Sequence, residues 1–283
     1  MPNKAFLEIT NACNLSCSFC HGTMRKIEFI TEEHFRIAAT KLRSFCDYLY
    51  FHLMGEPLLH PLIDRFFEIA NDLGFKIIIT TNGTLLKEKT KALLNAKSLH
   101  KISISLHAYE ANSLPVSLTD YLDNCFEFCK TASEKGIICV MRLWNINGMD
   151  SLNQEILMRM HEYFDGSTPK DWQQIYSGFK IKNKVFLEWG NHFDWPDING
   201  EYLGSSHTCY GLRDQIGVLC DGTVVPCCLD AEGNIPLGNI FEKTIEDILS
   251  TERAVALKNS FLTRKIMEPL CQRCGYAYKN RLP

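Results

Sequence analysis

Segments that alternate between strand-like and helix-like patterns run through the first 165 residues and constrain the fold most strongly. Apolar residues recur at helical spacing over 35–42, after a predicted N-cap at Thr31 with Glu32 and Glu33 in the first turn. This order predicts an α/β fold, a parallel sheet with crossover helices. We expect strands at 4–10, 48–53, 75–80, 101–106 and 137–143, and further helices at 62–73, 85–96, 118–135 and 151–164.

Three cysteines follow the first predicted strand with the spacing C-x3-C-x2-C: Cys13, Cys17 and Cys20. A [4Fe–4S] cluster normally takes four cysteines, so three would leave one iron open. An open coordination position is what separates a catalytic metal site from a closed structural one. The spacing therefore favours a reactive cluster, and a zinc site with a fourth ligand elsewhere stays open as an alternative.

Composition narrows the class of protein. The 283 residues allow one barrel of about 200 residues plus a small appendage. The net charge is −3 and no run of five basic residues occurs, which disfavours a polynucleotide substrate. The sequence contains no stretch of 18 apolar residues, so we predict no membrane span. Thirteen cysteines without an export signal predict a cytoplasmic protein with metal or redox work, not a disulfide framework.

The cysteine loop, with Phe19 before its third cysteine and Gly22 after it, resembles that of the radical S-adenosylmethionine (SAM) superfamily. The resemblance implies a partial (βα)6 TIM-like barrel, in which the open iron binds SAM and the backbone of Phe19 faces the adenine. It also implies the reaction. A reduced cluster cleaves SAM to methionine and a 5′-deoxyadenosyl radical, which takes a hydrogen atom from the substrate. An electron donor such as flavodoxin or ferredoxin is then required.

The tetrapeptide Met54-Gly55-Glu56-Pro57 ends the second predicted strand and resembles the superfamily's GGEP motif, with methionine in place of the first glycine. The resemblance implies that the backbone of Gly55 and Glu56 receives the SAM amino group, since glycine permits close approach. An ordinary strand-to-helix turn is the alternative.

Three further positions complete the implied SAM site. Asn82 belongs to a T-N-G turn after the third strand, although N-G is also a plain turn signal. Ser105, on the fourth strand, is the candidate for the ribose. Arg142, on the fifth strand, is the candidate for the SAM carboxylate, and an exposed arginine at a strand end is the alternative.

A second cysteine set occurs near the C-terminus, with the pattern C-x12-G-x4-C followed by C-x2-C. It resembles the Twitch, or half-SPASM, extension of radical SAM enzymes, which implies one auxiliary [4Fe–4S] cluster; zinc is the rival. We divide the chain into a radical SAM barrel, 1–204, and a Twitch domain, 205–283. A hairpin is expected at 215–226 and a short helix at 245–249. The implied ligands are Cys209, Cys227, Cys271 and Cys274, with Cys220 and Cys228 as neighbours.

Four cysteine ligands would leave the auxiliary cluster without an open iron, so we expect it to carry electrons and not to hold substrate. The other cysteines, Cys46, Cys125, Cys129 and Cys139, have the pattern of small core residues.

Candidate catalytic residues are Glu8, His52 and Glu188, which we expect to face the barrel interior. A buried carboxylate needs a partner and could transfer a proton or recognise polar NH groups. Glu188 opens the unusual segment 188–196, which also holds His192, Asp194 and Trp195.

A small-molecule substrate is favoured, because Cys13 arrives too early for a preceding peptide-recognition domain. The best specific prediction is a queuine lyase, which releases a 7-deazaguanine base in queuosine salvage. The alternatives are an aminocyclitol or alcohol dehydrogenase of the Twitch type, an enzyme that modifies ribosomal peptides, and a cluster-binding scaffold without turnover.

Overall fold

The computed structural model describes residues 4–164 and 172–279. It divides into two compact units, which we describe separately. The terminal unit contains residues 1–13, 20–76 and 193–283, and the central unit contains residues 14–19 and 77–192. No helix within these described stretches has both the length and the apolar character that crossing a bilayer demands.

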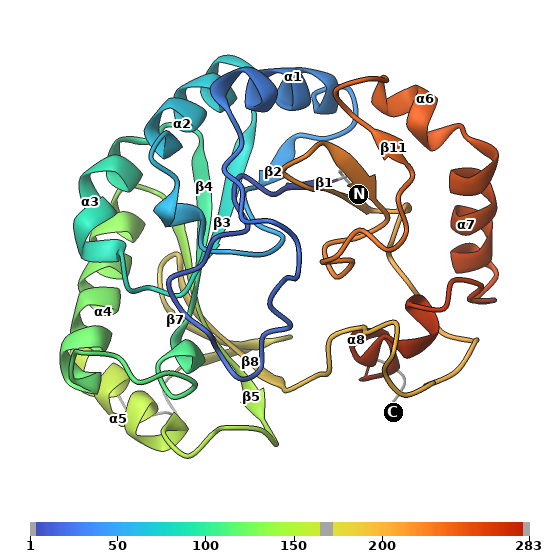
Figure 1. The fold of residues 1–283 in the computed structure, drawn as a ribbon. Helices are drawn as coiled ribbons and strands as arrows, with labels where there is room; N and C mark the ends of the chain where they lie inside the picture. The colour runs from blue at the N-terminus through green and yellow to red at the C-terminus, as the bar shows by residue number, and fades with distance from the viewer. Residues whose placement is uncertain (1–3, 165–171, 280–283) are drawn as a thin grey trace. The chain divides into compact units, whose positions relative to one another are not determined.

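The central unit is built on a sheet in which β3 (Lys76–Thr81), β4 (Leu99–Ser105), β5 (Ile138–Ile146) and β8 (Val185–Asn191) are parallel neighbours. Three helices alternate with these strands in sequence and lie side by side in Figure 1: α3 (Leu86–Asn95), α4 (Leu118–Glu134) and α5 (Asn153–Tyr163). Strands β6 (Gln173–Ile175) and β7 (Gly178–Lys182) extend the edge beyond β8 as antiparallel neighbours. The predicted strand–helix alternation is therefore observed here.

The two faces of this sheet differ in chemistry. On β4, Ile102 and Ile104 are fully buried, and they alternate with Lys101, Ser103 and Ser105 on the opposite face. The interior of a parallel barrel is normally filled by branched apolar residues. A polar interior face is thus unusual and marks the surface where chemistry is expected.

The terminal unit contains β1 (Lys4–Leu7), which pairs in parallel with β2 (Tyr48–Tyr50) and with β9 (Gln215–Val218). Strand β10 (Thr223–Val225) forms the predicted hairpin with β9 and pairs on its other side with β11 (Gly238–Asn239). Its helices are α1 (Glu32–Leu42), α2 (Ile63–Asp72), α6 (Ile245–Leu249), α7 (Glu252–Leu262) and α8 (Gly275–Lys279).

Several local predictions are confirmed and others need correction. Thr31 caps α1 by accepting a hydrogen bond from the His34 backbone N–H, and the helix at 245–249 has the expected bounds. The first two strands are shorter than predicted, since the chain leaves regular pairing after Leu7 and Tyr50. The parallel pairing of β9 with β1 was not predicted, because only tertiary structure brings these segments together. The division at 204/205 stays a prediction.

Candidate active site and cluster-binding loops

The cysteine loop leaves β1 and is held by side-chain hydrogen bonds. In the central unit, Asn112 Nδ2 donates to Cys17 Sγ at 3.1 Å, and Asn112 Oδ1 accepts from the Ser16 backbone N–H at 3.1 Å. In the terminal unit, Cys13 and Cys20 are exposed. Exposed thiols on an irregular loop fit cluster ligands better than core residues, and the ligand role of the three cysteines stays a prediction.

The return path of this loop is fixed onto the end of β1 in the terminal unit. The Asn11 side chain donates to the Lys26 carbonyl and accepts from the Glu28 N–H, both at 2.8 Å. The Thr10 hydroxyl donates to the Glu28 carbonyl at 2.8 Å. These contacts satisfy buried polar groups on both sides and define where the loop closes.

Gly55 meets the start of the cysteine loop at very short range. Its φ is +76°, and a Cβ at this position would lie 2.5 Å from the Thr10 carbonyl oxygen and 2.7 Å from that of Ala12. The next residue, Glu56, donates its N–H to the Ala12 carbonyl at 2.7 Å, and its side chain accepts from the Leu58 N–H at 3.0 Å. Glycine is therefore required here by the close packing of backbone on backbone.

Asn82 occupies the predicted turn after β3, but its side chain binds protein. Its Nδ2 donates to Asn14 Oδ1 at 2.9 Å, and its Oδ1 accepts from the Thr84 N–H at 3.0 Å. Asn82 is 8% exposed. These contacts connect the T-N-G turn to the first residues of the cysteine loop within the central unit, so any cofactor role of Asn82 stays a prediction.

Ser105, Arg142 and Glu188 form one cross-strand row in the central unit. Ser105 pairs with Arg142, and Arg142 pairs with Glu188, on adjacent parallel strands. Arg142 Nε donates to Glu188 Oε2 at 2.9 Å, and the guanidinium lies 4.4 Å from the centre of the Trp144 ring. Lys101 Nζ lies 3.6 Å from Glu188 Oε1. Two residues predicted independently thus form one ion pair, at mid-strand positions of β5 and β8.

A hollow of about 230 Å³ lies in the central unit beside Phe19. The ring of Phe19 packs on His107 at 4.6 Å between centroids. Burial lowers the pKa of His107 to about 4, and its Nδ1 lies 3.0 Å from the Arg142 carbonyl oxygen. The hollow therefore borders Phe19, the residue before the third cysteine. Its lining consists of Ser18, Phe19, Asn145, Gly148, Met149 and His192.

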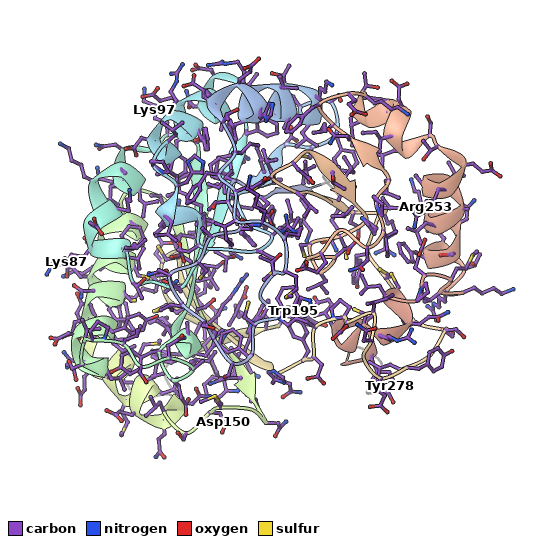
Figure 2. All side chains as sticks on the ribbon, in the orientation of Figure 1. Lys87, Lys97, Asp150, Trp195, Arg253 and Tyr278 are labelled. Atoms are coloured by element: carbon purple, nitrogen blue, oxygen red, sulfur yellow. The ribbon has the colours of Figure 1, made fainter. Side chains whose placement is uncertain are left out.

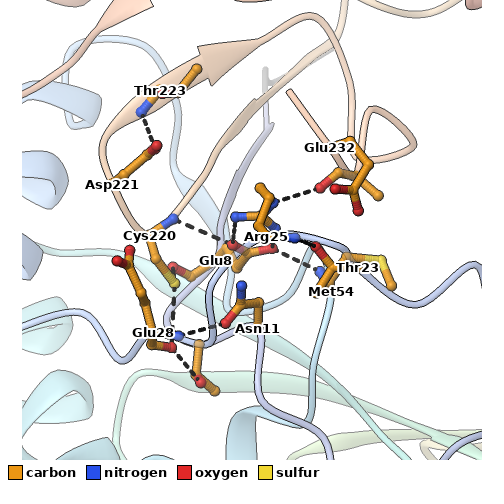
Figure 3. A network of polar contacts seen from close by, with 12 residues as sticks. Glu8, Asn11, Thr23, Arg25, Glu28, Met54, Cys220, Asp221, Thr223 and Glu232 are labelled. Atoms are coloured by element: carbon orange, nitrogen blue, oxygen red, sulfur yellow. Dashed lines mark hydrogen bonds and ion pairs between the residues drawn. The ribbon is translucent and has the colours of Figure 1, made fainter. Parts of the chain in front are cut away.

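Glu8 is completely buried in the terminal unit. Its carboxylate forms an ion pair with Arg25 at 2.8 Å and accepts the backbone N–H groups of Met54 and Cys220 (Figure 3). The sequence predicted a partner for this carboxylate, but it did not identify Arg25. A catalytic role for Glu8 stays a prediction, and these contacts favour a positioning role instead.

His52 lies against aromatic rings of the terminal unit. Its ring is 5.4 Å from that of Phe6 and 5.7 Å from that of Tyr50, in edge-on geometry in both pairs. This packing is typical of an imidazole that belongs to the local core, and a catalytic role for His52 is not tested by it.

The four predicted auxiliary ligands lie together in the terminal unit. Burial raises the pKa of the Cys227 thiol well above its usual value, and its near neighbours Cys228, Cys209, Cys271 and Cys274 raise it further. Within the described residues, no three Cys, His, Asp or Glu side chains are spaced to hold a single metal ion. The four partly buried thiols nevertheless supply a donor set that suits an iron–sulfur cluster.

The two neighbouring cysteines have different surroundings from these ligands. Cys220 is buried, and its Sγ donates to the Glu8 carbonyl at 3.2 Å. Cys228 packs against an apolar cluster that includes Phe6, Leu53 and Val225. Both contacts support the interpretation of Cys220 and Cys228 as neighbours, not ligands.

The segment after β8 lies between residues of both cysteine motifs in the terminal unit. The Trp195 ring, labelled in Figure 2, stacks with His21 at 6.5 Å between centroids. Phe193 contacts Tyr276 edge-on at 5.2 Å. A Cβ on Gly275 would lie 2.5 Å from the Asp194 carbonyl oxygen, so this segment passes tightly against the final C-x2-C motif.

Sequence reasoning missed Arg25 and Asn112, although both hold the cysteine loop. No spacing or local pattern identifies them, because each acts across a long sequence separation.

Comparisons with known proteins agree with this geometry. The family model described as "Radical SAM superfamily" matches residues 7–161, and the SPASM model, described as "Iron-sulfur cluster-binding domain", matches residues 209–275. GTP 3',8-cyclase of Aquifex aeolicus is 29% identical over 273 residues, covering 81% of this chain and 82% of the relative. The sporulation killing factor maturation protein SkfB of Bacillus subtilis is 24% identical, with coverage of 91% and 67%.

Other relatives match over a smaller part of this chain and of their own length. A probable GTP 3',8-cyclase of Saccharolobus solfataricus is 30% identical over 145 residues, and the chain spans 47% of its length.

Solved structures share the fold at low sequence identity. Native anSMEcpe with bound AdoMet has a TM-score of 0.63 at 16% identity, with coverage of 99% of this chain and 95% of that one. BtrN in complex with AdoMet and 2-DOIA has a TM-score of 0.56 at 18% identity, with coverage of 97% and 93%. These similarities and the parallel strands above show the partial TIM-like α/β barrel of this class.

The family models imply SAM, a SAM-binding [4Fe–4S] cluster and an auxiliary cluster. These cofactors fit the cysteine loop, the close approach of Gly55 and the four late cysteines. The chain is an enzyme of the radical SAM superfamily, of the Twitch/SPASM type, whose cofactors are SAM and [4Fe–4S] clusters that include an auxiliary one.

Proposed function

We propose that this enzyme takes a hydrogen atom from a small polar substrate that carries a guanine-like base, with queuine as the specific candidate. The reaction would then be a lyase step that releases a 7-deazaguanine base in queuosine salvage. The observation that carries the proposal is the row of Ser105, Arg142 and Glu188 across three parallel strands. Barrel enzymes of this kind act at the carboxyl ends of their strands.

The cofactors, when bound, supply a 5′-deoxyadenosyl radical for hydrogen abstraction, and the protein supplies orientation and exclusion of water. In the central unit, the hollow beside Phe19 is the candidate position for the adenine. A contact of the SAM amino group with the backbone of Gly55 and Glu56 stays an expectation from the resemblance. Arg142 Nη2 makes no hydrogen bond within residues 4–164 and 172–279, so it can receive the SAM carboxylate while Nε holds Glu188.

Glu188 is the candidate for recognition of the base. Its side chain is 17% exposed and forms ion pairs with Arg142 and Lys101. An ionised carboxylate accepts hydrogen bonds only, and a guanine-like edge offers two adjacent NH donors. The relative from Aquifex aeolicus acts, by its name, on GTP, whose base is guanine. This likeness supports a base of that kind.

The second candidate is an aminocyclitol or alcohol dehydrogenase. It is favoured by the likeness to BtrN in complex with 2-DOIA, which extends over 93% of that chain. In either case we propose that the auxiliary cluster carries electrons, that flavodoxin or ferredoxin is the electron donor, and that the enzyme works in the cytoplasm. A peptide substrate, suggested by the likeness to SkfB, is the third candidate.

Deuterium transfer tests the proposal. Reconstituted enzyme is incubated without oxygen with SAM, a reductant and deuterated queuine, aminocyclitols or peptides. We expect deuterium in 5′-deoxyadenosine with queuine, and loss of that transfer in Glu188→Gln. Transfer from an aminocyclitol alone would support the dehydrogenase, and transfer from a peptide alone would refute a small substrate. If SAM is never cleaved with any of them, the non-catalytic scaffold is favoured.

A further inference from the structure

The hydrogen bonds of Glu8 leave its carboxylate no capacity for a substrate. Arg25 Nη1 and Nη2 donate to Oε1 and Oε2, each at 2.8 Å. The backbone N–H groups of Met54 and Cys220 add one bond to each oxygen, at 3.2 and 3.3 Å. A carboxylate that accepts a bidentate arginine and two N–H groups has its favourable acceptor positions filled. Glu8 is therefore a structural anchor for Arg25.

Arg25 and its neighbour extend this anchor to the region that follows β10. Arg25 Nε donates to the Ala231 carbonyl at 2.8 Å. The Met24 N–H donates to the Glu232 carboxylate, with distances of 3.1 and 3.2 Å to its two oxygens. Ala231 and Glu232 lie inside the region that matches the iron–sulfur cluster-binding domain. Figure 3 shows Glu8, Arg25 and Glu232 in this network of contacts.

We propose that Arg25, held by Glu8, is a positioning residue that fastens the loop after Cys20 to the C-terminal extension. The extension then has a second task beside carrying its own cluster: it orients the last ligand of the SAM-binding cluster. Groups behind a metal ligand fix its orientation, and their loss typically lowers metal affinity or activity about 10- to 100-fold. The same Glu8 carboxylate holds Met54, directly before Gly55, so one anchor serves two parts of the SAM site.

The chemistry of the pair explains why arginine is needed. Its planar guanidinium makes two bonds to Glu8 and a third, in another direction, to Ala231. Lysine keeps the charge but cannot reproduce this fork. A buried ion pair is not by itself a gain in stability over apolar packing. Its bidentate geometry instead fixes one arrangement of three chain segments.

Hydrogen exchange on the metal-free protein gives a readout that needs no activity. Arg25→Lys and Glu232→Ala are compared with Arg159→Lys, which alters another bidentate arginine, paired with Asp123 in the central unit. We expect the amides of residues 22–26 to exchange about tenfold faster or more in the first two variants and at the wild-type rate in the control. Wild-type exchange in both variants would overturn the proposal.

Spectroscopy of the reconstituted enzyme separates positioning from mere stability. In Arg25→Lys and Glu232→Ala we expect a KM for SAM raised about tenfold and a weaker change of the reduced cluster's electron paramagnetic resonance signal on SAM addition. Glu8→Gln should show the same pattern if it folds, and the other two variants decide if it does not. A raised KM for substrate with an unchanged KM for SAM would assign Glu8 and Arg25 to the substrate and refute the positioning role.

Discussion

Replacing Gly55 by alanine tests the contact between the GEP motif and the cysteine loop. The structure supplies a matched control, because Gly74 has the same φ of +76° but no atom within 4 Å of its would-be Cβ. At Gly55 the same Cβ would lie 2.5 to 2.8 Å from three backbone atoms of Thr10, Asn11 and Ala12. Backbone atoms cannot rotate away, so the loop itself must move.

The two substitutions should therefore lower the free energy of unfolding by different amounts. Left-handed backbone costs a non-glycine residue about 1–2 kcal/mol, which both variants share. The overlap at Gly55 adds about 1–3 kcal/mol of overpacking. For a chain of this size about 1 kcal/mol shifts the midpoint of thermal unfolding, Tm, by about 2 °C. We expect Gly74→Ala to lower Tm by about 2–4 °C and Gly55→Ala by about 4–10 °C.

Thermal unfolding of the metal-free variants, followed by circular dichroism under anaerobic conditions, measures this difference. Reconstitution adds a second readout: Gly55→Ala should bind less iron at the cysteine loop, and Gly74→Ala should bind as much as wild type. Equal loss of Tm in the two variants would refute the close approach as the reason for glycine at this position.

Two other predictions concern the site, and a third concerns the buried His60. Cys227→Ala should lower the iron content from ~8 to ~4 per chain, whereas Cys228→Ala should keep it; equal loss in both would make Cys228 a ligand. Glu188→Gln should reduce kcat/KM for the substrate about 10- to 100-fold, because a charged recognition group worth about 1.5–3 kcal/mol is lost. The KM for SAM should stay within about twofold of the wild-type value. An unchanged kcat/KM would show that Glu188 does not belong to the substrate site. His60, whose burial lowers its pKa to about 4, contributes stability above pH ~6.5 that is lost as the pH falls toward 4. This lowering of the His60 pKa corresponds to about 3 kcal/mol of stability. His60→Gln should therefore flatten the stability profile over that window in urea titrations, and an equally steep profile would contradict this.

The parts of the fold that the sequence predicts are those that depend on local sequence patterns. The N-cap at Thr31 and the hairpin at 215–226 depend on neighbours in the chain, and both occur where expected. Ser105 and Arg142 lie on adjacent parallel strands, β4 and β5, that the sequence predicts. Strand β8, which carries Glu188, was not predicted.

Contacts that depend on loop paths could not be predicted in the same way. The partner of Glu8 is Arg25, beyond an irregular loop, and nothing in the intervening pattern specifies their meeting. Asn112 reaches Cys17 across 95 positions of sequence. The strands β6 and β7 lie between α5 and β8, where no clear period of apolar residues marks them.

Formation of 5′-deoxyadenosine tests the central claim most directly. Wild-type enzyme and a variant with alanine at Cys13, Cys17 and Cys20 are reconstituted without oxygen, reduced with dithionite and given SAM. The product is quantified by mass spectrometry. We predict 5′-deoxyadenosine from the wild type and none above background from the variant. Equal amounts from both proteins, or none from a wild type that carries its full iron, would contradict radical SAM chemistry at this loop.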